Sequence, residues 1–184
     1  MCGEVVRAEL VQGNIIVWDI EKGRSLYKLG YYGKPLGISK PKFADFNAPL
    51  VLDVIEAIYL AEKGILEVYE DERKLEVEEV IERAEKTYEN FREKYQVYKD
   101  LRERGFIVTP GIKFGSDFAV YRIGPGLEHA PFIVQVKSTG EALSAFEIVR
   151  SGRLATTVRK YFTIAIPDST RGKTAYILFE WWRA

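Results

Sequence analysis

The sequence has 184 residues, of which 47% are hydrophobic and 29% are charged, as in an ordinary globular protein of one domain or two small ones. Lys and Arg together number 27, as do Asp and Glu, so the formal net charge is zero. This balance excludes a protein that coats nucleic acid through its overall charge, but it permits a local basic patch.

A single cysteine and a single histidine restrict the chemistry further. Cys2 cannot form an internal disulfide, and no zinc-finger spacing exists. His129 alone cannot supply a cluster of histidine ligands, so we expect no metal and no other cofactor. The sequence shows no signal peptide and no apolar run of membrane-spanning length, so we expect a cytoplasmic protein without a membrane partner.

The first stretch of the chain predicts a β-hairpin and a short helix. Two apolar runs flank the turn signal Gly13-Asn14 over residues 4–18, which is typical of a hairpin. Residues 23–32 then predict a loop and a short helix, with Ser25 as its N-cap.

A loop rich in Gly, Pro and Lys is predicted over residues 33–49. Its cations include Lys40 and Lys42, which could contact phosphate. A solvated connection is the alternative that the sequence leaves open.

Two helices and a strand are predicted next. Apolar residues at helical spacing predict one helix over Leu50 to Lys63, and residues 65–69 suit a short strand. Residues 75–104 then predict one long amphipathic helix, which Gly105 ends.

The second half of the chain predicts a compact α/β unit with a mixed sheet. Two predicted strands, 118–123 and 132–136, form a hairpin whose loop carries His129. The remaining predicted elements are strands at 106–108, 162–166 and 174–182 and helices at 140–150 and 153–160. We therefore expect the α+β class, with a small β-rich α+β N-terminal domain over residues 1–90. A C-terminal α/β domain with a central mixed sheet would occupy residues 91–184.

Three side chains in this second unit could together cleave RNA without a metal. The phenol of Tyr121 can take a proton from a ribose 2′-OH, and the imidazole of His129 can give one to the leaving 5′-oxygen. The ammonium of Lys160 can stabilise the charge that develops on the phosphate. Each residue also has an ordinary structural explanation, as a packing tyrosine, a structural histidine or a solvated cation.

A family resemblance gives these residues specific roles. Residues 113–121 read Lys-Phe-Gly-Ser-Asp-Phe-Ala-Val-Tyr, and His129 and Lys160 follow in order. This pattern resembles the catalytic domain of the archaeal tRNA-splicing endonucleases. The resemblance implies an endoribonuclease with Tyr121 as general base, His129 as general acid and Lys160 as the transition-state cation. It would remove introns from precursor tRNA at bulge–helix–bulge sites, leaving 2′,3′-cyclic phosphate and 5′-hydroxyl ends.

The resemblance also implies RNA-binding residues. Arg153 resembles the arginine that clamps a base, and Trp181 resembles an aromatic partner used by some members. Burial in the core or at a subunit interface is an equal alternative for Trp181. The loop with Lys40 and Lys42 resembles an insertion in crenarchaeal catalytic subunits that reaches the RNA.

An apolar final strand and the loop before it bear on assembly. In the family, such strands pair between subunits, four units assemble, and an acidic loop docks into a neighbour. Here that loop, residues 167–173, has one acid and two bases. This departure favours a heterotetramer with a distinct structural subunit over a homotetramer.

Some functional alternatives remain open at this point. A non-catalytic structural or RNA-binding subunit of the same complex is the alternative function. A metal-dependent DNA nuclease would need acidic ligands, whereas Asp117, Asp100 and Glu103 are better explained as ion-pair partners of Lys113, Arg102 and Arg104. We also expect Lys160 or Arg122 to lower the pKa of the Tyr121 phenol. Otherwise Tyr121 would only position the 2′-OH.

Overall fold

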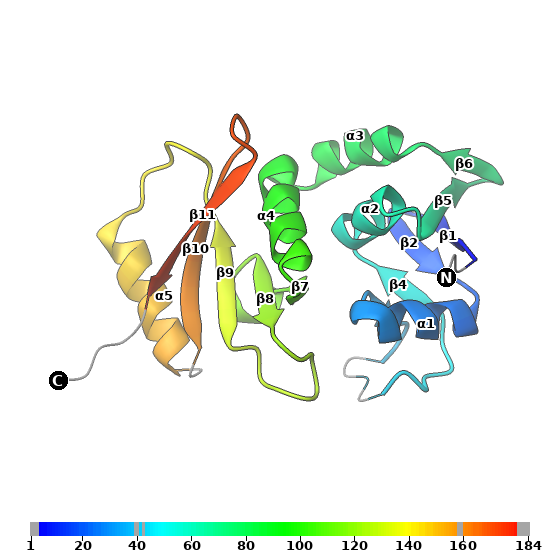
Figure 1. Ribbon diagram of the computed structural model, residues 1–184, viewed down its shortest axis with the longest axis horizontal. Coiled ribbons are helices and arrows are strands. Elements are labelled where there is room, and N and C mark those ends of the chain that lie inside the picture. The colour runs from blue at the N-terminus through cyan, green and yellow to red at the C-terminus, as the bar shows by residue number, and fades with distance from the viewer. Residues whose placement is uncertain (1–3, 39–40, 42, 158–159, 180–184) are drawn as a thin grey trace. The chain divides into compact units, whose positions relative to one another are not determined.

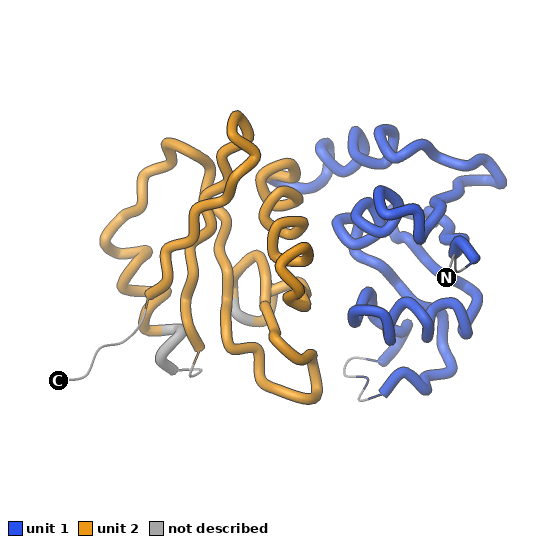
Figure 2. Tube along the Cα trace, in the orientation of Figure 1, with its two compact units in different colours: residues 1–89 blue, residues 90–184 orange. Residues whose placement is uncertain are grey.

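A computed structural model gives the architecture of residues 4–38, 41, 43–157 and 160–179. The chain divides into two compact units, Met1–Glu89 and Asn90–Ala184, which Figure 2 shows in blue and orange. The first unit contains a six-stranded sheet and the second a five-stranded sheet. Both units also contain helices, so the predicted α+β class is confirmed.

The first unit is built on a mixed sheet with the strand order β3-β4-β2-β1-β5-β6. Its strands are β1 (Val6–Val11), β2 (Asn14–Val17), β3 (Lys34–Pro35), β4 (Leu50–Leu52), β5 (Leu66–Glu70) and β6 (Arg73–Leu75). Strands β1 and β5 are parallel, and β1 and β2 form the predicted antiparallel hairpin. Gln12 and Gly13 make its turn with φ angles of 50° and 82°, a geometry typical of two-residue hairpin loops.

Helices α1 and α2 of the first unit begin at aspartate caps that were not predicted. Helix α1 (Ile20–Gly30) starts after Asp19, whose side chain accepts the N–H of Lys22, so the predicted N-cap at Ser25 was wrong. Helix α2 (Val54–Glu62) starts after Asp53, and the residues before it form β4. The predicted helix from Leu50 therefore began too early.

The long helix predicted over residues 75–104 is two helices, α3 (Val77–Thr87) and α4 (Phe91–Glu103). Tyr88 is extended, and Asn90 adopts a left-handed conformation with φ of 52°. Asn tolerates this conformation better than most residues, so the chain can turn between two amphipathic segments. Because the apolar stripe continues across both helices, the sequence pattern did not predict this break.

The second unit has the strand order β11-β10-β9-β8-β7. Its strands are β7 (Ile107–Pro110), β8 (Phe118–Tyr121), β9 (Phe132–Val136), β10 (Tyr161–Asp168) and β11 (Lys173–Phe179). Strands β9 and β10 are parallel and the other neighbours are antiparallel, so the predicted mixed sheet is confirmed. Figure 1 shows α4 and α5 (Ala145–Thr157) on opposite sides of this sheet.

Helix α5 is one helix, although the sequence predicted two. Ser144 and Glu147 exchange hydrogen bonds between side chain and backbone in the manner of a capping box, which starts the helix. Gly152, near the predicted break, keeps a helical conformation. The face of the sheet toward α5 is packed by Ile133, Phe162 and Ile164, with Leu143 against them. None of the described helices is long and apolar enough to cross a membrane.

Gly111 lies where the chain passes close to the backbone of Phe118 in the second unit. It precedes a 3₁₀ turn, Ile112–Phe114, that leads toward β8. A Cβ atom at position 111 would lie 2.5 Å from the Ser116 Oγ and 2.8 Å from the backbone N of Phe118. The Phe118 backbone belongs to β8 and cannot move without disturbing the sheet.

We predict that Gly111→Ala lowers the free energy of unfolding by about 1–3 kcal/mol, as overpacking typically does. Gly152→Ala is the matched control, because a Cβ there meets no atom within 4 Å. That helical position should gain up to about 1 kcal/mol from the substitution. Guanidinium denaturation measures both, and equal unfolding free energies for wild type and Gly111→Ala would contradict the packing analysis.

Candidate active site

The register of three strands places Tyr121 and Lys160 in one row across the sheet. Val120 pairs with Phe132, and Phe132 pairs with Tyr161. Pro131 directly precedes Phe132. Continuing the antiparallel β8–β9 register places Tyr121 opposite Pro131, and continuing the parallel β9–β10 register places Lys160 opposite Pro131 as well. Residues in one such row point to the same face of a sheet, and here that row shares the face of Ile133 and Phe162, toward α5. Two strand spacings separate the backbones of Tyr121 and Lys160 by about 10 Å.

The loop between β8 and β9 carries His129 and begins and ends at this same edge. The β8–β9 pairing is antiparallel, so β8 ends where β9 begins. Strand β10 runs parallel to β9 and therefore also begins there. The three predicted catalytic residues are thus brought to one edge of the five-stranded sheet by strand direction alone.

Lys160 ties the histidine loop to β10. Its Nζ donates to the carbonyl oxygen of Ala130 at 2.5 Å, and the N–H of Tyr161 donates to Pro131 at 2.8 Å. Ala130 is 3% exposed, whereas its neighbour His129 is exposed. The anchored backbone therefore presents an accessible imidazole. Partial burial of Lys160 lowers the pKa of its amine below the ordinary value of 10.5.

The Tyr121 phenol is half-buried, and its pKa is raised above the ordinary value of 10.0. Burial is the main cause, and the negative charge of Glu128 adds to it, while a hydrogen bond with the Thr109 side chain acts in the opposite direction. The expectation that Lys160 or Arg122 lowers this pKa was wrong. In the free protein at neutral pH, Tyr121 is therefore a neutral phenol.

Acidic residues around the motif hold the scaffold together. Asp117 pairs with Lys94 of α4 at 2.9 Å, and its other oxygen accepts the N–H of Val136 at 2.8 Å. Asp100 forms an ion pair with Arg104 at 2.9 Å, whereas the cation paired with Asp117 is Lys94 and not the expected Lys113. Asp117 thereby joins α4, the start of β8 and the end of β9.

Of the four residues predicted to bind RNA, the structure describes one. Arg153 is exposed on α5, the helix beside the sheet face that carries Tyr121 and Lys160. Trp181, Lys40 and Lys42 lie outside the described residues.

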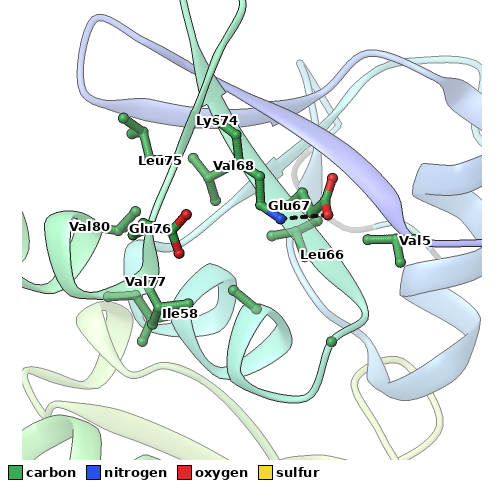
Figure 3. A pocket seen from close by; sticks show the side chains of 12 residues that line it. Val5, Ile58, Leu66, Glu67, Val68, Lys74, Leu75, Glu76, Val77 and Val80 are labelled. Atoms are coloured by element: carbon green, nitrogen blue, oxygen red, sulfur yellow. Dashed lines mark hydrogen bonds and ion pairs between the residues drawn. The ribbon is translucent and has the colours of Figure 1, made fainter.

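A pocket of about 230 Å³ occurs in the first unit, between β5, β6, α2 and α3 (Figure 3). Apolar side chains dominate its lining, and Lys74 donates to Glu67 beside it at 2.7 Å. None of the predicted catalytic residues lines this pocket, so we place the candidate active site at the sheet edge. Among the described residues, no group of three or more His, Cys, Asp or Glu side chains could hold a metal ion.

Comparison with known proteins identifies the family of both halves of the chain. Residues 91–176 match the tRNA intron endonuclease, catalytic C-terminal domain, and residues 6–81 match the tRNA intron endonuclease, N-terminal domain. The chain belongs to the tRNA intron endonuclease family.

Relatives from this family are similar to the chain over nearly its full length. A tRNA-splicing endonuclease of Hyperthermus butylicus is 48% identical over 178 residues, which are 96% of this chain and 98% of the relative. One of Sulfurisphaera tokodaii is 45% identical over 174 residues, covering 94% and 97% of the two chains. One of Saccharolobus islandicus is 41% identical over 179 residues, covering 96% and 98%.

Family membership settles the general activity. The chain is an endonuclease of tRNA splicing. Sequence analysis overlooked two polar side chains near Tyr121, Thr109 and Glu128. The position of Glu128, directly before the only histidine and after the turn Gly124-Pro125-Gly126, was a usable signal for the second of them.

We predict that the Tyr121 phenol titrates above pH 10.0, because burial and a nearby carboxylate both disfavour the phenolate. The measurement is the difference between the tyrosinate absorbance titrations of wild type and Tyr121→Phe, with near-UV circular dichroism to confirm that both remain folded. A component with a midpoint below 10.0 would contradict the stated environment of the ring.

Proposed function

We propose that this endonuclease acts in the cytoplasm and cleaves precursor tRNA at bulge–helix–bulge splice sites by a metal-independent transesterification. Tyr121 takes the proton of the 2′-OH, or orients that hydroxyl while solvent water takes the proton, and the 2′-oxygen attacks the adjacent phosphorus. His129 protonates the leaving 5′-oxygen, and Lys160 stabilises the negative charge on the phosphate in the transition state. A 2′,3′-cyclic phosphate and a 5′-hydroxyl result.

One observation carries this proposal. Tyr121 and Lys160 occupy one row on one face of the sheet, and Lys160 is bonded to the backbone beside His129. A separation of about 10 Å between the two strands leaves room for a phosphodiester between two long side chains. The accessible His129 can then approach the leaving group from the loop.

The raised pKa of Tyr121 supports one of its two possible roles at neutral pH. A phenol is a strong base only when ionised, and burial makes the ionised form rarer than in free tyrosine. Binding of RNA brings phosphate charge to the site and disfavours the phenolate further. Orientation of the 2′-OH by the neutral phenol is therefore the role that the free protein supports best.

The substrate must present unstacked bases, which arginine and aromatic side chains hold by stacking. The exposure of Arg153 on α5, the helix beside the sheet face of Tyr121 and Lys160, supports this task for it. Trp181, Lys40 and Lys42 remain predicted RNA contacts.

A non-catalytic subunit of the same complex is the alternative function. Such a subunit has no need of a phenol, an imidazole and an amine at one sheet edge. All three occur here, and none of them is fully buried. These observations favour the catalytic form.

The features of β11 and the preceding turn bear on the assembly. Strand β11 is an edge strand with Ile177 and Leu178 42% and 49% exposed, which suits pairing with another subunit. In the turn before it, Asp168 accepts the N–H groups of Thr170 and Arg171 at 3.0 and 3.2 Å. The one acid of this loop is thus engaged within its own turn. We propose that a distinct subunit supplies the acidic loop in a heterotetramer.

We predict that wild-type enzyme with its partner cleaves intron-containing precursor tRNA in excess EDTA. His129→Ala and Lys160→Ala should each lower the single-turnover rate by about 10²–10⁴-fold, because each removes a group that acts in the transition state. RNA affinity, measured by filter binding, should change much less.

Lys113→Ala is the matched control for Lys160→Ala, because Lys113 is exposed and follows β7, at the opposite edge of the sheet. It should cleave at the wild-type rate. A strict metal requirement, or normal turnover by His129→Ala, would refute the proposed chemistry.

We also predict that the chain alone neither forms a stable homotetramer nor cleaves efficiently, because its β10–β11 turn has no free acidic surface to offer a neighbour. Light scattering over a range of concentrations measures the mass, and the same cleavage assay measures activity with and without a second splicing-endonuclease subunit. Full activity from four identical copies would overturn the requirement for a partner.

A further inference from the structure

The carboxylate of Glu128 folds back onto the start of its own loop. Its Oε1 accepts the N–H groups of Arg122 and Ile123 at 2.5 and 2.6 Å, directly after β8 ends at Tyr121. A hydrogen bond from the N–H of Gly124 also contributes to the low pKa of this carboxyl. Three consecutive backbone N–H groups therefore converge on one anion, as in backbone nests.

Backbone contacts close the same loop around this carboxylate. The N–H groups of Leu127 and Glu128 donate to the carbonyl of Gly124 at 3.3 and 3.2 Å, and Pro125 forms a bridge with Glu128. Residues 122–128 thus form a compact loop that the Glu128 carboxylate holds closed. The next residue is His129.

The residues that follow His129 are held by separate hydrogen bonds. Ala130 accepts the hydrogen bond from Lys160, and Pro131 accepts the N–H of Tyr161. The imidazole therefore projects from a short backbone segment held by Glu128 on one side and by β10 on the other. Loops without such anchors leave their side chains in many orientations, at a cost to catalysis.

We propose that Glu128 is a positioning residue that holds the His129 imidazole in place for proton transfer to the leaving oxygen. This inference rests on the proposed function of His129 and adds a specific residue to it. Glu128 does not touch the substrate in this account. It acts through the backbone of residues 122–124 and through the orientation of the residue that follows it.

The charge of Glu128 provides a second readout. Hydrogen bonds from the backbone, that of Ile123 first, lower the pKa of this carboxyl, so it is ionised throughout the neutral range. Its negative charge in turn helps to raise the pKa of Tyr121. Removal of the charge should therefore move the midpoint of the Tyr121 titration downward, which checks that the carboxylate lies near the ring.

We predict that Glu128→Ala lowers the single-turnover cleavage rate by about 10–100-fold, because displacement of a catalytic group by about 1 Å costs on the order of 100-fold. The dissociation constant for precursor tRNA should change less than about threefold, since Glu128 makes no ground-state contact with RNA in this account. Glu128→Gln keeps an acceptor oxygen for the loop and should recover most of the lost rate.

Glu141→Ala is the matched control. Glu141 also accepts a loop N–H, that of Ser138 at 3.1 Å, but it follows β9 at the opposite edge of the sheet. Its loss should leave the cleavage rate within about twofold of wild type. An equal loss in Glu128→Ala and Glu141→Ala would mean a general effect on folding and would overturn the inference.

A double variant tests whether Glu128 works through His129. If it does, Glu128→Ala should slow cleavage no further in a His129→Ala background, because the positioned group is already absent. Additive losses would assign Glu128 a separate role. Normal turnover by His129→Ala refutes the proposed function, whereas a slow His129→Ala with a normal Glu128→Ala refutes only the positioning role.

The single histidine makes the same point measurable without RNA. Nuclear magnetic resonance of histidine-labelled protein gives the signals of one imidazole, that of His129. Glu128→Ala should increase the fast motion of this ring, and Glu128→Gln should restore it toward wild type. Unchanged motion of the His129 ring in Glu128→Ala would contradict the proposed positioning role of Glu128, even if cleavage slowed.

Discussion

The parallel pairing of β9 with β10 is the constraint on which the candidate site depends. Because Phe132 pairs with both Val120 and Tyr161, the ends of three strands are fixed at one edge of the sheet. A slip of one residue in either pairing would move Tyr121 or Lys160 to the other face. The apolar residues Ile133, Phe162 and Ile164 prevent such a slip, since it would remove them from the core beneath α5. Packing of these apolar residues thereby fixes the positions of Tyr121 and Lys160 on the sheet.

Lys160 has both a structural role and a proposed catalytic role. Its hydrogen bond to Ala130 holds the histidine loop in the free protein, and its ammonium is the cation that the proposed reaction uses. On the other side of His129, the Glu128 carboxylate gathers the backbone N–H groups of Arg122 and Ile123. An exposed imidazole on a loop of only ten residues thus has two anchors, the Glu128 carboxylate within the loop and Lys160 directly before β10. This arrangement combines accessibility to a large RNA with a restricted position.

The sequence predicted much of this arrangement, and its failures have physical causes. Alternating apolar residues and turn signals predicted the strands of the second unit, and the ordered pattern of Tyr121, His129 and Lys160 predicted the family. Apolar spacing did not reveal the break at Asn90, because the stripe of α3 and α4 continues across it.

The burial of Tyr121 and the path of the Glu128 side chain could not be predicted from the sequence. The raised pKa of Tyr121 arises from burial and from Glu128, which depend on how the loop folds back. Neither spacing nor composition specifies that path. The pairing of Asp117 with Lys94, and not with Lys113, likewise depends on where α4 packs against the sheet.

The most direct test is a structure of the assembled enzyme bound to precursor tRNA with a 2′-deoxy nucleotide at the splice site, which binds but cannot react. The account predicts one scissile phosphate with the Lys160 Nζ and a His129 ring nitrogen each within about 3.5 Å of its oxygens, and with the Tyr121 hydroxyl facing the 2′ position. A scissile phosphate bound away from this sheet edge, beyond the reach of the three side chains, would contradict it.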